Sequence, residues 1–372
     1  NGANPNVKDY DGSTPLMIAT RKGETNMVKL LLDKGADINI QESDGKNALI
    51  YATLNAGAWD DPADKNMVQL LLERGADINV QDIDGNTPLI IAAYEGDIEV
   101  VRLLLERGAD INIHDSDGKN ALIYATLEED TKMVQLLLKR GADINIQNSD
   151  GKNALIYATL ANYGRMVQLL LDNGADPNIR DHEGENALII AVYEGDTEMV
   201  QLLLNKGADP NIRDNDGSTP LIIASFRGYT ELVRLLLENG ANPTIMAYDG
   251  STAFSTAVEN QNADIVELLE PHNRSTKIQS RFRGRQTRRK ARTQKASQQL
   301  QASRLPTGYD VSRLIGKYLS RMPYNPDVTR RMEEERQNEQ IAKYLKTLAQ
   351  YGGKKKQRKT KKKRKKSKKK KK

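Results

Sequence analysis

The sequence contains no cysteine among its 372 residues and only three histidines. Without cysteine there is no disulfide framework and no thiolate zinc site, which suits a reducing compartment, so we expect an intracellular protein, cytoplasmic or nuclear. His114, His182 and His272 show no metal-ligand spacing, and there is no phosphate-binding glycine loop or nucleophile motif. These absences predict a non-enzymatic protein with no catalytic residues, no cofactor and no metal site.

Long apolar runs are also lacking. No segment is long enough to span a bilayer and the start shows no signal-peptide pattern, so we expect no membrane span. The chain opens with Asn1-Gly2-Ala3-Asn4-Pro5, which copies the segment from Asn239 to Pro243. We therefore expect it to be a piece of a longer protein that lacks an N-terminal segment.

What the sequence does contain is a repeat. Variants of one stretch recur at a fixed interval, with a single longer interval between the second copy and the third. Aligned on the acidic residue before glycine, the copies start at Asp11, Asp44, Asp84, Asp117, Asp150, Glu183, Asp216 and Asp249. A fixed period of roughly 33 residues predicts a stacked array, because one such unit cannot bury its own apolar face.

Each copy predicts a turn, a helix, a second helix and a loop. Asp-Gly suits a tight turn, and the Thr or Asn that follows, such as Asn120, stands where a helix needs an N-cap. Pro or Ala then opens a short helix with a LIYA or LIIA core. A second apolar run, such as Met133 to Leu138, is closed by Gly141, which suits the left-handed position after a helix.

Thr14-Pro15-Leu16, Thr87-Pro88-Leu89, Thr219-Pro220-Leu221 and the recurrent LLLxxGADxN ending resemble the ankyrin repeat over residues 1 to about 270. The resemblance implies an all-α solenoid of eight helix-turn-helix units with short hairpin loops, acting as a monomer. One departure is systematic: the family's His after Thr-Pro-Leu is replaced by Met17, Ile50, Ile90, Ile123, Ile156, Ile189, Ile222 or Ser255. That change removes a bracing hydrogen bond and predicts less rigid turns.

The second copy carries seven extra residues around Asn55 to Asp64, including the only tryptophan, Trp59. Insertions in repeat arrays map to loops, so we expect a longer link between the two helices of this copy. Trp59 either packs on a neighbour or gives a partner an extra contact point.

In the ankyrin family, the turn tips and the exposed end of the first helix line the concave side. Carried over by position, that helix end predicts an apolar ladder of partner-binding residues: Leu54, Tyr94, Leu127, Leu160, Tyr193 and Phe226. Acidic neighbours of the ladder are Asp84, Glu95, Glu128, Glu185 and Glu194. The surface would then complement a basic amphipathic helix or extended segment of a protein partner. Alternatively, the ladder residues pack between adjacent units and expose little.

After residue 274 the sequence changes character. The run IQSRFRGRQTR resembles the IQ motif, which implies binding of a calmodulin-like protein through a basic helix over residues 275–304. The matching residues are Ile278, Gln279, Phe282, Arg283, Gly284 and Arg288. Ile278 and Phe282, four apart, share one helical face. The alternative is an Arg-rich helix that contacts phosphates or the acidic repeats.

Residues 305–351 predict an amphipathic helical hairpin, because Val311, Leu314, Ile315, Tyr318 and Leu319 fall on one helical face. Its opening Leu-Pro and closing Tyr-Leu resemble an F-box, which would imply a ubiquitin-ligase adaptor, although two extra residues spoil the spacing.

Residues 352–372 predict a disordered basic end, in which every residue after Gly353 except Gln357, Thr360 and Ser367 is Lys or Arg. Such a run binds nucleic-acid phosphates without reading bases and resembles a nuclear localisation signal, which implies an importin as partner. The polyanion-binding residues would be Lys354, Lys355, Lys356, Arg358, Lys359, Lys361, Lys362, Lys363, Arg364, Lys365 and Lys366.

Charge divides the chain in two. Residues 275–372 hold 34 Lys and Arg against 6 Asp and Glu, a net +28, whereas residues 1–274 hold 22 against 44, a net −22. The basic end therefore seeks an external polyanion or folds back onto its own array. The ankyrin resemblance implies a protein-binding scaffold over residues 1–274, and the combination resembles the multi-ankyrin proteins found in large DNA viruses and their hosts. The alternatives are a nucleic-acid-associated or nuclear-targeted protein and the ligase adaptor.

Overall fold

A computed structural model describes residues 4–59 and 62–274, with the side chains of all of these except 57–59, 62–64, 273 and 274. This part of the chain forms sixteen helices and no strand, as predicted, with one isolated bridge between His114 and Asn120. It divides into two compact parts, the first ending at Ala253 and the second starting at Phe254.

The helices come in consecutive pairs. The first part contains α1 (Pro15–Arg21), α2 (Thr25–Asp33), α3 (Ala48–Trp59), α4 (Pro62–Glu73), α5 (Pro88–Glu95), α6 (Ile98–Glu106), α7 (Ala121–Leu127), α8 (Thr131–Lys139), α9 (Ala154–Leu160), α10 (Gly164–Asp172), α11 (Ala187–Glu194), α12 (Thr197–Asn205), α13 (Pro220–Arg227) and α14 (Thr230–Glu238). At and beyond the boundary lie α15 (Ala253–Glu259) and α16 (Ala263–Arg274).

The odd-numbered helices begin where the sequence places their caps. The hydroxyl of Thr87 accepts the backbone N–H of Ile90 at 3.2 Å, and the side-chain oxygen of Asn153 accepts that of Ile156 at 2.9 Å. Each bond satisfies one of the backbone donors that a helix start leaves free. The predicted cap works with either residue.

Some of the even-numbered helices start with an equally local cap, whereas α2, α10 and α14 start without a side-chain cap. Asp97, Asp130 and Asp196 cap the starts of α6, α8 and α12 with their carboxylates. Gly141 follows α8 with a φ of +89°, a left-handed conformation that glycine adopts without steric cost. These short helices are therefore bounded by their own sequences.

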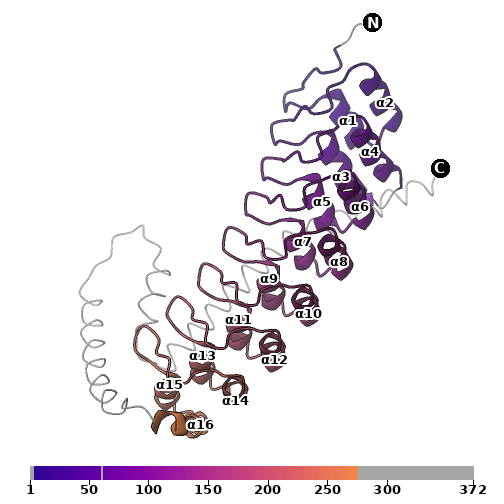
Figure 1. The fold of residues 1–372 in the computed structure, drawn as a ribbon. Helices are drawn as coiled ribbons and strands as arrows, with labels where there is room; N and C mark the ends of the chain where they lie inside the picture. Colours follow the sequence, from indigo (N-terminus) through magenta and orange to yellow (C-terminus); the bar gives the residue numbers. More distant parts are fainter. Residues whose placement is uncertain (1–3, 60–61, 275–372) are drawn as a thin grey trace, which may run out of the picture. The chain divides into compact units, whose positions relative to one another are not determined.

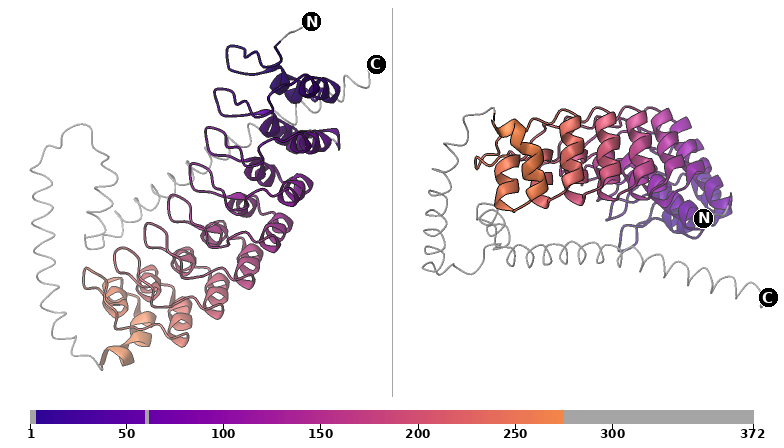
Figure 2. Two further views of the ribbon diagram at one scale, coloured as in Figure 1. Left: turned by 45° about the horizontal axis from the view of Figure 1, so that its top comes forward. Right: turned by 90° about the horizontal axis from the view of Figure 1, so that it is seen from below.

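Within the first part, each odd-numbered helix packs against its even-numbered partner and against the odd-numbered helices on either side. The loops that join successive pairs all project on the side of the odd-numbered helices (Figure 1), and the second view shows the helices of successive pairs side by side (Figure 2, right). The core lies between the two helix rows. In the α7–α8 pair the fully buried residues include Leu122, Ile123, Met133, Val134 and Leu137.

The seven extra residues of the second pair do not lengthen its link as predicted. They extend the helices, because α3 and α4 each contain 12 residues whereas α7 and α8 contain 7 and 9. The side chain of Asn55, in the extended part of α3, donates to the carbonyl of Thr20 at 3.0 Å and so covers an open end of α1. The side chain of Trp59 lies outside the described residues.

Two series of hydrogen bonds connect successive pairs. In the first, a backbone N–H of one hairpin donates to the backbone carbonyl of the acidic residue in the preceding turn, as the N–H of Ser149 donates to the carbonyl of Asp117 at 2.8 Å. In the second, the Asn of a GADxN segment accepts the backbone N–H of the next such segment, as Asn112 does from Asp143 at 2.9 Å. Both bonds recur along the first part, so each pair is fixed to its neighbour outside the core as well as within it.

Candidate partner-binding surface

The hairpin turns that border the predicted binding surface are braced from inside. The carboxylate of Asp115 accepts the backbone N–H groups of Asp117 at 2.9 Å and Lys119 at 2.8 Å. Backbone bonds Gly118 to Asp115 and Asp115 to Lys119, both 2.9 Å, close the same turn. Asp82, Asn148, Asp181 and Asp214 do the same in other turns. The turns thus have an internal brace without the family's histidine, provided by the side chain two residues before Asp-Gly, and lower turn rigidity stays a prediction.

Tyrosines of the odd-numbered helices add a second brace. The hydroxyl of Tyr124 in α7 donates to the carboxylate of Asp115 at 2.5 Å, and that of Tyr157 in α9 accepts from the amide of Asn148 at 2.9 Å. Tyr51 in α3 donates to Glu42 in the same way. Burial raises the pKa of Tyr157. These hydroxyl groups hold each helix to its turn.

A partly buried ion pair connects two of these turns. The ammonium of Lys152 is 2.7 Å from the carboxylate of Asp181, a side chain that is 1% exposed. Burial alone would lower the pKa of Lys152, but the hydrogen bond to Asp181 and the charges of Asp181, Glu183 and Asp150 raise it overall. The pair links two consecutive hairpins, and losing one partner would leave a charge without compensation.

The six ladder residues occupy the same place in the structure. Each is the seventh residue of its helix, in α3, α5, α7, α9, α11 and α13. Leu160 and Phe226 are exposed, at 48% and 40%, while the other four are half-buried. The ladder therefore presents apolar surface and also packs within the array.

The half-buried members are held by neighbouring helices. The ring of Tyr94 meets the ring of Tyr124 edge-on with centroids 5.7 Å apart. The guanidinium of Arg227 lies over the ring of Tyr193 at 5.6 Å. Leu54 packs against a buried cluster that includes Val80. These contacts fix the side chains before any partner arrives, which lowers the entropy lost on binding.

The acidic neighbours predicted for the ladder differ in exposure. Asp84, Glu128 and Glu194 are exposed, whereas Glu95 and Glu185 are half-buried. The border of the ladder thus carries carboxylates that solvent or a partner can reach.

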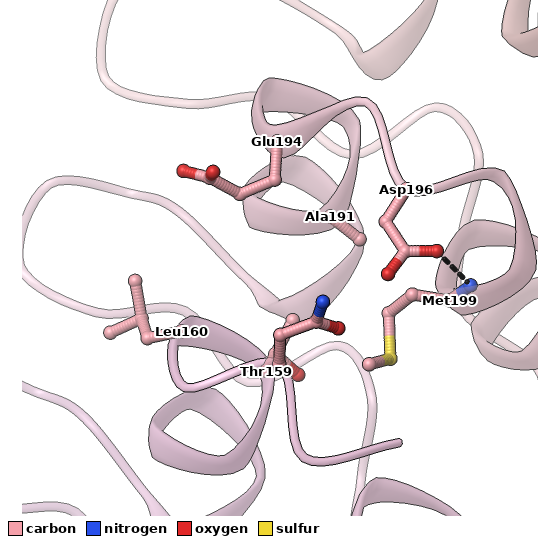
Figure 3. A pocket seen from close by; sticks show the side chains of 7 residues that line it. Thr159, Leu160, Ala191, Glu194, Asp196 and Met199 are labelled. Atoms are coloured by element: carbon pink, nitrogen blue, oxygen red, sulfur yellow. Dashed lines mark hydrogen bonds between the residues drawn. The ribbon is translucent and has the colours of Figure 1, made fainter.

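A hollow of about 140 Å³ opens beside Leu160. It is lined by Thr159, Leu160, Asn162, Ala191, Glu194, Asp196 and Met199, from the C-terminal ends of α9 and α11 and the start of α12. Leu160 and Glu194 stand at one edge and Asp196 and Met199 at the other (Figure 3). Asp196 uses one oxygen to accept the backbone N–H of Met199 at 2.9 Å.

Sequence reasoning identified Leu160 and Glu194 but missed the hollow between them. Asn162 takes the place of Gly96, Gly195 and Gly228 in other pairs, with a left-handed φ of +55°. Glu129 makes the same exchange with a φ of +56°, so this position alone did not mark the hollow in the sequence.

Several predictions fall on residues that the structure does not describe. These are the IQ-like residues from Ile278 to Arg288, the hairpin over residues 305–351 and the basic run from Lys354 to Lys366. Within the described ranges, no group of His, Asp or Glu side chains could hold a metal ion. In the same ranges no helix has the length and apolarity needed to cross a membrane.

Comparison with known proteins agrees with this architecture. A family model described as ankyrin repeats, three copies, matches residues 1–82, 58–148, 142–214 and 188–281. The chain is 47% identical over 53 residues to an ankyrin repeat protein of fowlpox virus (strain NVSL), covering 14% of this chain and 28% of the viral protein. It is 40% identical over 48 residues to an ankyrin repeat-containing protein of Schizosaccharomyces pombe, covering 13% and 23%. The match thus spans only about a quarter of the length of these relatives.

Proposed function

From the premise that this chain belongs to the ankyrin repeat family, we propose that it is a scaffold that holds a protein partner on the concave surface carrying the ladder residues. Ankyrin repeats are protein–protein interaction modules, and the family is generally non-enzymatic. The observation that supports the proposal is the exposure of Leu160 and Phe226, at 48% and 40%, at helix positions whose equivalents are half-buried. Apolar side chains exposed beside fixed aromatic rings are typical of binding surfaces.

The spacing of the ladder suits a regular partner segment. Packed helices lie about 8–10 Å apart, and seven residues of a partner α-helix rise about 10.5 Å. Three residues of an extended segment rise about 10 Å. A helix with apolar residues seven apart would therefore place one side chain at each successive ladder position, whereas residues three apart on a strand face opposite sides and would not.

The charge of the array favours a basic segment. Residues 1–274 carry a net −22, and Glu128 and Glu194 are exposed beside the ladder. A basic partner gains from this field during approach, an effect that salt weakens. The proposed partner is thus a protein with a basic amphipathic segment.

The test is a double substitution, Tyr193→Ser with Phe226→Ser, in the full chain. Proteins captured from cell extract by the native chain should be lost by this variant, while its far-UV circular dichroism stays native. The matched control is Met27→Ser with Leu30→Ser, since these residues of α2 are 45% and 51% exposed and lie in an even-numbered helix, outside the ladder. A folded ladder variant that retains every partner would refute the proposal.

A second candidate function rests on the basic C-terminal run. Its nearly uninterrupted Lys and Arg after Gly353 favour association with nucleic acid by counterion release. DNA or RNA affinity should then fall steeply with salt and disappear when residues 354–372 are deleted. Affinity that survives the deletion would exclude this role for the run.

A further inference from the structure

The space that forms the hollow beside Leu160 is filled by an aromatic side chain in the next pair toward the C-terminus. Where α13 and α14 meet α11, Tyr229 fills the equivalent space: a Cβ on Gly195 would stand 2.9 Å from its ring. In the next pair toward the N-terminus the residue equivalent to Tyr229 is Asp196, whose side chain is too short to cover Asn162. The opening therefore lies where Asp196 stands at the position of the aromatic Tyr229, a position that Asp97 and Asp130 occupy in earlier pairs.

The lining of this hollow combines apolar atoms with two carboxylates. Leu160, Ala191 and the thioether of Met199 provide apolar surface, and Glu194 and Asp196 provide the charge. No Lys or Arg in the described part of the chain forms an ion pair with either carboxylate. The array thus leaves an acidic opening uncompensated at the most exposed ladder residue.

We propose that this hollow is an anchor pocket for one basic side chain, preferably arginine, of the partner segment. The aliphatic stem lies on Leu160 and the guanidinium faces Glu194 and the oxygen of Asp196 that does not cap α12. This assignment rests on the proposed function and specifies its partner: a basic residue next to the apolar residue that packs on the ladder.

Size and charge select this occupant. Small-molecule sites have volumes of about 300–1,000 Å³, whereas this hollow holds about 140 Å³, enough for one side chain. An acidic side chain would meet two carboxylates of its own sign. A purely apolar one would displace water from the carboxylates without offering them a partner, which carries a desolvation cost. Arginine combines a stem that packs with a planar group that pairs with carboxylates, and it is enriched among interface anchors.

The experiment follows the methyl NMR signal of Met199 in the full chain. That signal is assigned with Met199→Leu, because Leu232 occupies the equivalent position in α14. The probes are N-acetyl-arginine methylamide and its neutral isostere, N-acetyl-citrulline methylamide. The arginine probe should shift the Met199 signal in a saturable, salt-sensitive way, and the citrulline probe should bind at least several-fold more weakly.

Two conservative variants identify the carboxylates. Glu194→Gln and Asp196→Asn should each weaken the arginine probe about two- to fivefold, the range for partly exposed ion pairs. Asn is as good an N-cap as Asp, so α12 keeps its start in the second variant. The matched control is Asp209→Asn, an exposed carboxylate in a GADxN segment, which should leave the affinity unchanged.

Four outcomes would overturn the assignment: no shift with arginine, equal shifts with both probes, affinity unchanged in Glu194→Gln and Asp196→Asn, or equal loss in Asp209→Asn. The assignment would also fail if added salt, without any probe, moved the Met199 signal of the native chain to the position that it has in the Glu194→Gln variant. The pocket would then already hold a cation from the chain's own basic C-terminal residues and not from a partner.

The two proposals fail separately. If the pocket binds the arginine probe but the Tyr193 and Phe226 variant keeps its partners, the anchor-pocket proposal stands and the ladder proposal fails. If that variant loses its partners and the arginine probe does not shift the Met199 signal, the ladder proposal stands and the anchor-pocket proposal fails.

Discussion

The contact between consecutive turns depends on glycine for two separable reasons, which Gly118→Ala and Gly141→Ala distinguish. Both glycines have left-handed backbones, with φ of +78° and +89°. A Cβ on Gly118 would lie 2.7 Å from the backbone nitrogen of Ser149, in the next turn, whereas a Cβ on Gly141 would have nothing within 4 Å. The first substitution therefore adds a collision to the strain that both share.

The shared part is small. A left-handed conformation costs an L-residue about 1–2 kcal/mol. The lower entropy of alanine in the unfolded chain returns about 0.4–1 kcal/mol of this. We therefore expect Gly141→Ala to lower the free energy of unfolding by about 1 kcal/mol.

Gly118→Ala should cost more, because the methyl group must displace the backbone of the next turn. Overpacking of this kind costs about 1–3 kcal/mol. The displacement also breaks the 2.8 Å bond from Ser149 to Asp117, and a hydrogen bond of this type contributes about 0.5–1.5 kcal/mol. The expected total loss is about 2.5–5.5 kcal/mol, several times the loss of about 1 kcal/mol at Gly141.

Urea unfolding of the full chain, followed by circular dichroism, measures both losses. Hydrogen exchange then locates the damage. The amides of the turns at Asp117 and Ser149 should lose protection in Gly118→Ala, since each repeat contacts only its neighbours. Equal losses of stability in the two variants, or unchanged protection at Ser149, would refute the close-approach argument.

Three further predictions concern single sites. Glu129→Gly should stabilise the chain by about 1 kcal/mol, because Glu129 has a left-handed φ of +56°. Asn162→Gly should stabilise it less, because Asn tolerates that conformation. Urea unfolding midpoints compare the two variants, and equal gains in stability would contradict this explanation. Burial raises the pKa of Asp214, so its carboxyl group favours folding below the unfolded pKa of 3.8 and this contribution is lost as pH rises through the folded value. Asp214→Asn, which can brace the turn as Asn148 does, should raise the melting temperature at pH 7, and a gain that persisted at pH 3 would exclude titration as its cause. The side-chain nitrogen of Asn153 is buried without a hydrogen bond, so Asn153→Thr should gain about 1 kcal/mol in the same urea assay, and a loss would show that the amide is satisfied.

Much of the fold could be predicted from sequence because its determinants are short-range. An N-cap such as Asn153 acts on a residue three positions away, and the glycine after a second helix acts on its own backbone. The repeat period aligns the copies with one another, so the position that all ladder residues share in their helices could be predicted by counting residues from the start of each copy. The insertion was misjudged because the run from Asn55 to Trp59 continues the helical pattern of α3, and nothing local in it enforces a stop.

Exposure along the ladder could not be predicted from local sequence. The heptapeptide ALIYATL forms both α7 and α9, yet its last residue is half-buried at Leu127 and 48% exposed at Leu160. Because the two heptapeptides are identical, the difference lies outside them, for example in the next pair, where Tyr163 follows α9 but Asp196 follows α11. The ion pair of Lys152 with Asp181, which joins two consecutive copies of the repeat, was missed for the same reason.

Folding and binding therefore depend on partly different positions of the same array. The bonds that hold successive pairs together involve backbone groups, the Asn of GADxN and the turn glycine, and none of these side chains belongs to the ladder. Leu160 can change with little effect on stability, because substitutions of exposed residues away from such bonds stay within about 0.5 kcal/mol. Since Asp196 also caps α12, only Asn, Ser or Thr could replace it without cost to that helix. The partner's basic residue would thus bind two carboxylates: Glu194, which can vary without effect on folding, and Asp196, which the cap of α12 constrains.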